Sequence, residues 1–275
     1  WRSIFVAAGG LTVVTAALSM LYLPESLAFL TRHKRRDEAL AWIKRVLGVN
    51  VSTRPGEGDR TPLNESVRGA GTSLLSSLNF RVNAGLWIGF FTLSYVAFAY
   101  FMWTPTVFVG AGFNMPRAIR CTSVYTFSAV LGVLVCVVLL PRAGSRILIL
   151  LSIAVGICAG IAFPSLLAGG VAKLSALNMT MALAGLGGGM SQSTVYALAA
   201  TAYPATYRAT AIGVCVGISR LGGILAALGG GMLLEVGGSL FFGVVVGMLI
   251  VGLIALAVMN RHIGVPASRA RCLGA

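Results

Sequence analysis

Seven long apolar runs divide this sequence, and they restrict its fold more than any other feature does. They cover approximately residues 4–23, 84–109, 121–140, 147–169, 179–202, 209–231 and 237–259. Each run is close to the roughly 20 apolar residues that a helix needs to cross a bilayer. Backbone groups in hydrocarbon must find their hydrogen bonds inside the protein, so such runs become helices. The predicted fold class is therefore all-α: a polytopic membrane protein with seven transmembrane helices.

The composition excludes several functional classes. Hydrophobic residues make up 57% of the 275 residues and charged residues only 10%, whereas soluble domains carry about 25% charged residues. The net charge of +14 does not indicate nucleic acid as a partner, because the basic residues lie in short links between apolar runs. No histidine and cysteine spacing suggests a metal site, and no cofactor is expected. We expect a lipid bilayer as partner, no catalytic residue and no enzymatic activity.

The polar segments define the predicted domain organisation. Residues 1–24 form one helix, 25–82 a long polar central loop, 83–260 a six-helix bundle, and 261–275 a tail. Within the loop, residues 26–47 have the pattern of an amphipathic helix with leucines on one face and basic residues on the other. Such a helix either lies on an anionic leaflet or forms a solvated linker.

The distribution of basic residues orients the chain. Sixteen Lys and Arg residues belong to the central loop, the tail and the links on that side, and four belong to the opposite side. Positive charge accumulates on the cytoplasmic side of membrane proteins. The central loop and the C-terminus are therefore predicted to be cytoplasmic, in a protein of the cell membrane.

One cation interrupts the run 209–231. Arg220 lies about 12 residues from the cytoplasmic end of this run, roughly 18 Å deep at 1.5 Å per residue. A charged side chain at that depth costs at least about 2.5–3.5 kcal/mol. No carboxylate lies in any run, and Glu235 is about four turns away. Arg220 is either a clamp for an organic carboxylate, which its planar fork fits, or a structural arginine.

The preceding run offers further polar groups. Gln192 and Tyr196 are four residues apart and so share a helix face. They either hold a substrate hydroxyl or carboxylate, or act as hydrogen-bonding contacts between helices. The glycines at 185 and 187–189 allow either close backbone approach or bending.

An aromatic face lies on the run 84–109. Phe91, Tyr95 and Phe98 follow the i, i+4, i+7 spacing of one helix face. They form either the aromatic wall of a substrate cavity or a packing surface. Trp103 and Pro105 follow, and a bend at this proline predicts an outer gate.

Several motifs resemble the major facilitator superfamily. Pro24-Glu25-Ser26 resembles the element that closes the sixth helix in its sugar, organic-ion and aromatic-acid members. Residues 203–213 together with 219–223 resemble the passage from helix ten to helix eleven in aromatic-acid/proton symporters and related organic ion transporters. The segment 103–113 resembles the end of helix seven in the aromatic-acid group.

The segment 141–146 is similar to the loop motif Asp-Arg-x-Gly-Arg-Arg of that superfamily. Arg142 and Arg146 match it and are candidate gating residues. Pro141 stands where the motif has an acid, and Ser145 replaces an arginine.

The resemblance implies two six-helix bundles around a central site that is exposed alternately to the two sides of the membrane. This chain then supplies the last helix of the first bundle and the whole second bundle. It opens without methionine, and we expect a fragment whose partner is the missing N-terminal half. The implied activity is secondary transport of small organic, aromatic carboxylates. The runs contain no Asp, Glu or His, so either proton coupling uses residues of the missing half or the protein is not proton-driven. The resemblance implies the former.

Two other functions fit parts of the pattern. A cation or drug exporter of the same superfamily has the same helices, but the lone positive charge of Arg220 argues against a cationic substrate. A membrane sensor that transports nothing, or a truncated subunit, would also carry these apolar runs.

Overall fold

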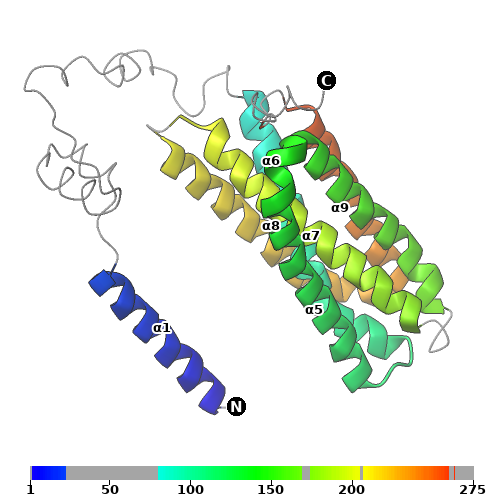
Figure 1. Ribbon diagram of the computed structural model, residues 1–275. Helices are drawn as coiled ribbons and strands as arrows, with labels where there is room; N and C mark the ends of the chain where they lie inside the picture. Colours follow the sequence, from blue (N-terminus) through cyan, green and yellow to red (C-terminus); the bar gives the residue numbers. More distant parts are fainter. Residues whose placement is uncertain (1, 23–79, 169–173, 205–206, 260–262, 264–275) are drawn as a thin grey trace, which may run out of the picture. The chain divides into compact units, whose positions relative to one another are not determined.

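The computed structural model describes residues 2–22, 80–168, 174–204, 207–259 and 263. These residues form six helices: α1 (Arg2–Tyr22), α5 (Phe80–Gly110), α6 (Met115–Ala168), α7 (Leu174–Ala202), α8 (Arg208–Val236) and α9 (Gly238–Ala257). The described part of the chain is thus all-α, as predicted. Helix α1 is a unit by itself, and α5 to α9 form a bundle of long helices (Figure 1). The predicted amphipathic helix at 26–47 lies outside the described residues.

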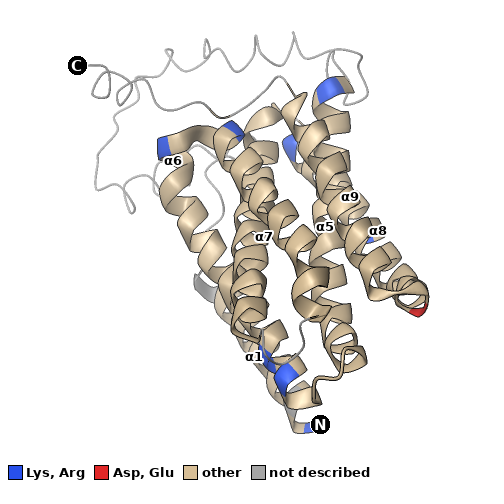
Figure 2. Ribbon diagram, turned by 90° about the vertical axis from the view of Figure 1, so that its right-hand side faces the viewer, with Lys and Arg blue, Asp and Glu red and all other residues tan. Residues whose placement is uncertain are grey.

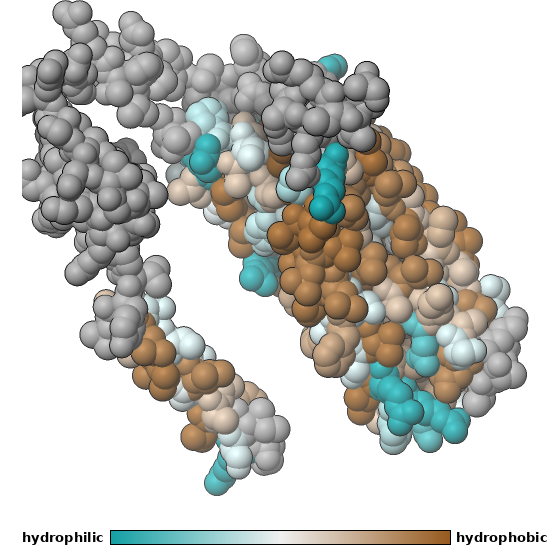
Figure 3. Space-filling model, in the orientation of Figure 1, coloured by the Kyte–Doolittle hydropathy of each residue, from teal (hydrophilic) through white to brown (hydrophobic). Residues whose placement is uncertain are grey.

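Most of the bundle helices have the apolar character of membrane spans, but α7, which contains the predicted run 179–202, is not among them. Four helices, α5, α6, α8 and α9, are long and apolar enough to cross a bilayer, and α1 contains a shorter apolar stretch, Phe5–Met20. The face of the bundle seen in Figure 3 is mostly hydrophobic along its middle. Basic residues gather mainly toward the ends of the bundle helices (Figure 2). This is the arrangement of an integral membrane protein.

Helix α6 contains two of the predicted spans, 121–140 and 147–169. Its 54 residues are interrupted at Gly144, whose φ of 76° and ψ of 163° are not helical. A positive φ is readily adopted by glycine, which has no Cβ to clash. The two arms of α6 both pack against α7: the first arm meets it at Gly185 and the second at Gly187. Gly144 thus marks the turn of a hairpin with both arms on one neighbour.

The glycines of α7 allow this close packing. A Cβ at Gly185 or Gly189 would collide with the backbone carbonyls of Tyr125 and Ala129 in the first arm of α6. A Cβ at Gly187 would lie 2.6 Å from the carbonyl oxygen of Ser152 in the second arm. Small residues at helix contacts are the usual means of close approach in membranes. Of the two predicted roles, Gly185, Gly187 and Gly189 have the close backbone approach, whereas an added Cβ on Gly188 would meet only the Tyr125 hydroxyl, at 3.4 Å.

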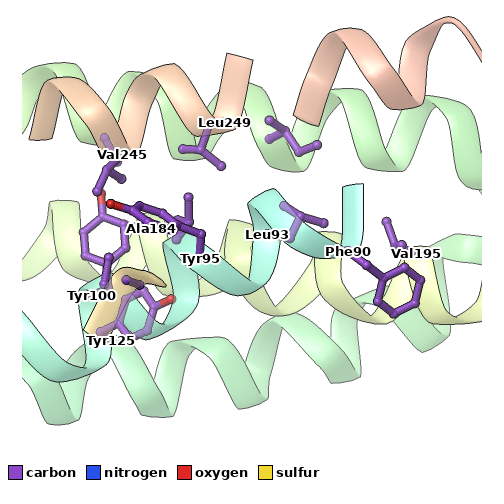
Figure 4. Packing of buried hydrophobic residues seen from close by; sticks show 14 of the residues in the cluster. Phe90, Leu93, Tyr95, Tyr100, Tyr125, Ala184, Val195, Val245 and Leu249 are labelled. Atoms are coloured by element: carbon purple, nitrogen blue, oxygen red, sulfur yellow. The ribbon is translucent and has the colours of Figure 1, made fainter. Parts of the chain in front are cut away.

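Aromatic rings fill the centre of the bundle. Tyr100 of α5 stacks on Tyr125 of α6, with ring centroids 5.1 Å apart (Figure 4). Phe163 of α6 packs on Phe242 of α9 at 4.4 Å. All four rings are buried. Through Tyr100 they pack the C-terminal half of α5 against both α6 and α9.

The glycine contacts predict a specific pattern of stability. Gly189→Ala places a methyl group against the carbonyl of Ala129, and overpacking of this kind costs about 1–3 kcal/mol. We expect the apparent melting temperature of the detergent-solubilised protein to fall by about 2–10 °C. Gly247→Ala on α9 is the control, because no atom lies within 4 Å of its added Cβ. A loss of stability in the control as large as that of Gly189→Ala would contradict the packing argument.

Candidate functional site

Arg220 lies on an exposed, otherwise apolar face of α8. It follows the start of the helix at Arg208 by 12 residues, or roughly 18 Å. Its neighbours on this face are Leu221, Ile224 and Leu228, which are 56%, 52% and 72% exposed. Within the described part of the chain, the Arg220 guanidinium makes no hydrogen bond or ion pair. The helix therefore presents one unneutralised cation in the middle of a hydrophobic surface.

The predicted aromatic face of α5 packs against α8 next to this arginine. Gly222 approaches the backbone of Phe91 and Tyr95, and a Cβ on Gly223 would lie 2.9 Å from the Phe98 ring. Tyr95 is buried at 6% exposure, whereas Phe91 and Phe98 stay half-buried. The structure thus brings all three aromatic residues to the contact that follows Arg220 on α8, with Tyr95 as part of the packed core.

Tyr196 also lies against α5, and Gln192 is on the same helix, α7. The Tyr196 ring is 39% exposed and meets Phe90 edge-on, with centroids 4.8 Å apart. The side-chain oxygen of Gln192 is buried and has no hydrogen-bond partner among the described residues. This pair and Arg220 are therefore on two helices that contact adjacent residues of α5. The structure records no hydrogen bond between the pair and Arg220.

Trp103 is anchored to α8. Its indole Nε1 donates a hydrogen bond of 2.9 Å to the carbonyl of Ala226. Its ring packs against Gly230 and Gly231, where added Cβ atoms would collide with or crowd it. Helix α5 continues through Pro105 to Gly110. The sequence predicts a gate here, but it does not predict this hydrogen bond, because donor and acceptor are 123 residues apart.

Arg142 and Arg146 are both exposed, on either side of the break at Gly144. No acidic residue is available to them among the described residues, where Glu235 of α8 is the only carboxylate. The buried residue here is Ser145. Its N–H donates to the carbonyl of Ile263 at 3.0 Å, and its hydroxyl accepts from the Ile263 N–H at 2.8 Å. The serine that departs from the family motif thus binds the chain beyond α9.

Tyr203 and Asn83 form a second long-range contact that the sequence does not predict. Tyr203, just after α7, donates a hydrogen bond of 2.9 Å to the side-chain oxygen of Asn83 in α5. Burial raises the pKa of the Tyr203 hydroxyl above its ordinary value, so the donor stays protonated. The Arg208 side chain donates to the Tyr203 carbonyl at 3.1 Å. These bonds join the starts of α5 and α8 at the end that the charge distribution predicts to be cytoplasmic.

The class of protein follows from the match of residues 1–227 to the Major Facilitator Superfamily. The match covers most of the chain, and the chain therefore belongs to this superfamily. Its members are membrane transporters rather than enzymes, which confirms the family and the absence of enzymatic activity that the sequence predicted.

Several curated relatives match most of this chain. The chain is 28% identical to a gallate transporter of Pseudomonas putida, over 86% of this chain and 52% of the relative. It is 27% identical to the 4-hydroxybenzoate transporter PcaK of Acinetobacter baylyi, over 94% of this chain and 56% of the relative. It is 25% identical to the 3-(3-hydroxy-phenyl)propionate transporter of Escherichia coli strain K12, over 95% of this chain and 57% of the relative. The chain thus spans about half the length of the curated relatives it matches, and all three transport aromatic acids.

The two indoles of α5 predict opposite responses to the same substitution. Trp103→Phe removes the donor to Ala226 and should destabilise the protein by about 0.5–1.5 kcal/mol. Trp87→Phe removes a buried N–H that has no partner among the described residues, and should be neutral or stabilising. Thermal unfolding of both variants in detergent measures the difference. Equal losses of stability would show that the Trp103 hydrogen bond does not link the two helices.

Proposed function

We propose that the complete protein is a secondary transporter that carries small aromatic carboxylates across the membrane by alternating access. The observation that carries the proposal is Arg220, an unneutralised cation on an exposed apolar face of a membrane-spanning helix. The identities of the relatives give independent support, since gallate, 4-hydroxybenzoate and 3-(3-hydroxyphenyl)propionate are all aromatic carboxylates.

The cost of burying a charge explains why Arg220 needs a partner. Facing lipid at this depth, the guanidinium would cost at least about 2.5–3.5 kcal/mol. Glu235 is 15 residues further along α8, about four turns away. In the proposed transporter this face of α8 borders the substrate pathway, and the guanidinium binds the substrate carboxylate with two parallel hydrogen bonds.

The neighbouring residues suit a planar substrate. Phe91 and Phe98 lie against Gly222 and Gly223, one turn or less from Arg220, and keep part of their rings exposed. Aromatic rings favour stacked or edge-on contacts with another ring. We assign Gln192, whose buried oxygen needs a donor, and Tyr196 to supporting hydrogen bonds. A cationic substrate is disfavoured, because Arg220 would repel it.

Coupling to protons requires a titratable group in the membrane. The described membrane spans carry no Asp, Glu or His apart from Glu235 near the outer end of α8. The proposal therefore assigns the coupling carboxylate to the remainder of the protein, outside this chain. The matched relatives are about twice as long as the aligned region, which leaves room for a first bundle.

The Arg220 assignment predicts a charge- and shape-specific loss of transport. Arg220→Ala in the full-length transporter should lower kcat/KM for labelled benzoate or 4-hydroxybenzoate at least tenfold, since a hydrogen bond to a charged group is worth about 1.5–3 kcal/mol. Arg220→Lys keeps the charge but loses the planar guanidinium that can bind a carboxylate with two hydrogen bonds. It should therefore retain more activity than Arg220→Ala but less than the unmodified protein. Uptake into cells or proteoliposomes measures all three proteins.

The control for these variants is Arg117→Ala, an exposed arginine near the start of α6. It should transport like the unmodified protein. Undiminished uptake by both Arg220 variants would overturn the clamp. A loss of folded protein in Arg220→Ala without a change in KM would instead assign Arg220 to a structural ion pair with the other half.

The orientation of the chain is also a proposal, based on the sixteen-to-four distribution of basic residues. A single cysteine at Asp59, in an otherwise cysteine-free transporter, should react with a membrane-impermeant thiol reagent only after the cells are opened. A cysteine at Arg117 should react in intact cells. The reverse pattern of labelling would invert the topology.

A further inference from the structure

A groove lies between the outer half of α5 and the first arm of α6. Its volume is about 440 Å³, within the range of roughly 300–1,000 Å³ of small-molecule pockets. Two phenylalanines line it, Phe101 and Phe127, and they are 58% and 74% exposed. Its polar lining consists of three hydroxyls of α6, those of Thr122, Ser123 and Thr126. The groove therefore combines aromatic walls with a row of hydroxyl groups.

These hydroxyls present acceptors to the groove. Each of them donates its proton within its own helix: Thr122 to the Ala118 carbonyl at 3.2 Å, Ser123 to that of Ile119 at 3.0 Å, and Thr126 to that of Thr122 at 3.0 Å. A hydroxyl has one proton and two lone pairs. With the proton used inside the helix, only lone pairs remain for a ligand.

Pro105 adds a further acceptor. Proline has no backbone N–H, so the carbonyl of Phe101, four residues earlier, loses its usual helical donor. Both residues line the groove. The polar groups of the groove thus accept hydrogen bonds, and the lining residues include no cation. A carboxylate, which also only accepts, finds no donor there, whereas a neutral ring with an O–H group finds several acceptors.

We infer that this groove is a recognition site for the phenolic hydroxyl of a hydroxylated aromatic substrate. The ring stacks between Phe101 and Phe127, and its O–H donates to the oxygens of α6. A phenol has a pKa near 10 and keeps its proton at neutral pH. The inference rests on the proposed function for its substrate, a hydroxylated aromatic acid, but the chemistry of the groove stands independently of Arg220.

The groove is separate from the Arg220 site. Helix α8 contacts α5 at Phe91 and Tyr95 just after Arg220, whereas the groove lies at Phe101 and Pro105. Ten residues of helix correspond to about 15 Å, more than the length of one benzene ring with its two substituents. One small acid therefore cannot occupy both sites at once. The groove is an outer site on the substrate pathway, ahead of the arginine.

Two substitutions test the site in the full-length transporter. Thr126→Val keeps the shape of the side chain and removes the hydroxyl, and it should raise KM for 4-hydroxybenzoate about fivefold, the value of one neutral hydrogen bond. KM for benzoate, which lacks the phenol, should not change. Thr201→Val is the matched control, because Thr201 is also exposed and also bonded to its own helix at the Ala197 carbonyl, far from the groove. It should leave both values unchanged.

A neutral probe separates this inference from the proposed function. Binding of 4-methylphenol to the purified transporter, measured by saturation-transfer NMR with toluene as reference, should exceed that of toluene. The difference should disappear in Thr126→Val and persist in Arg220→Ala. If no aromatic acid is transported but 4-methylphenol binds in this way, the proposed function is wrong. The inference that the groove recognises a phenolic hydroxyl is then still supported. If 4-methylphenol and toluene bind equally, or if Thr126→Val changes KM for both acids alike, the groove holds a lipid chain or a helix of the other half, and the inference is overturned.

Discussion

Close contact between backbones is the constraint on which this bundle depends. In a bilayer, helices gain little hydrophobic energy from one another, because lipid tails are as apolar as leucine side chains. What holds them is dispersion between surfaces that touch, and α7 supplies it with glycines that meet the carbonyls of Tyr125, Ala129 and Ser152. These contacts position both arms of α6 against α7. Gly222 and Gly223 of α8 likewise allow close contact with α5. The position of Arg220 relative to the aromatic face of α5 follows from that second contact.

Polar side chains in the bundle are mostly satisfied within their own helix. Serine and threonine hydroxyls along α5, α6 and α7 donate to carbonyls three or four residues earlier. Polar atoms that reach another segment of the chain are therefore informative. Among them are the bonds of Trp103 to Ala226, of Tyr203 to Asn83 and between Ser145 and Ile263. The thiols of Cys121 and Cys136 in α6 also bond to side chains of α7. Trp103, Tyr203 and Ser145 all lie within segments that resemble the family.

Much of the fold could be predicted from the sequence because the bilayer permits few alternatives. The apolar runs place the helices to within a few residues, and the proline and glycine between 121–140 and 147–169 indicate the hairpin that Gly144 makes. The glycines of α7 were correctly interpreted as contacts. The pairings at 118 to 123 residues' separation could not be predicted, because neither partner is unusual in its own helix. The burial of Tyr95 could not be predicted either. Its spacing places it on one helix face with Phe91 and Phe98, and only the packing shows that it is buried. The roles of Arg220 and its neighbours in transport stay predictions.

The bond between Ser145 and Ile263 has a mechanical consequence. The turn of α6 and the segment beyond α9 are joined through backbone atoms of both residues, so their motions are coupled at this point. If the bundle rocks as one body, Ile263 is carried with it. A fluorescent group attached at Ile263 would then report the tilt of the whole bundle.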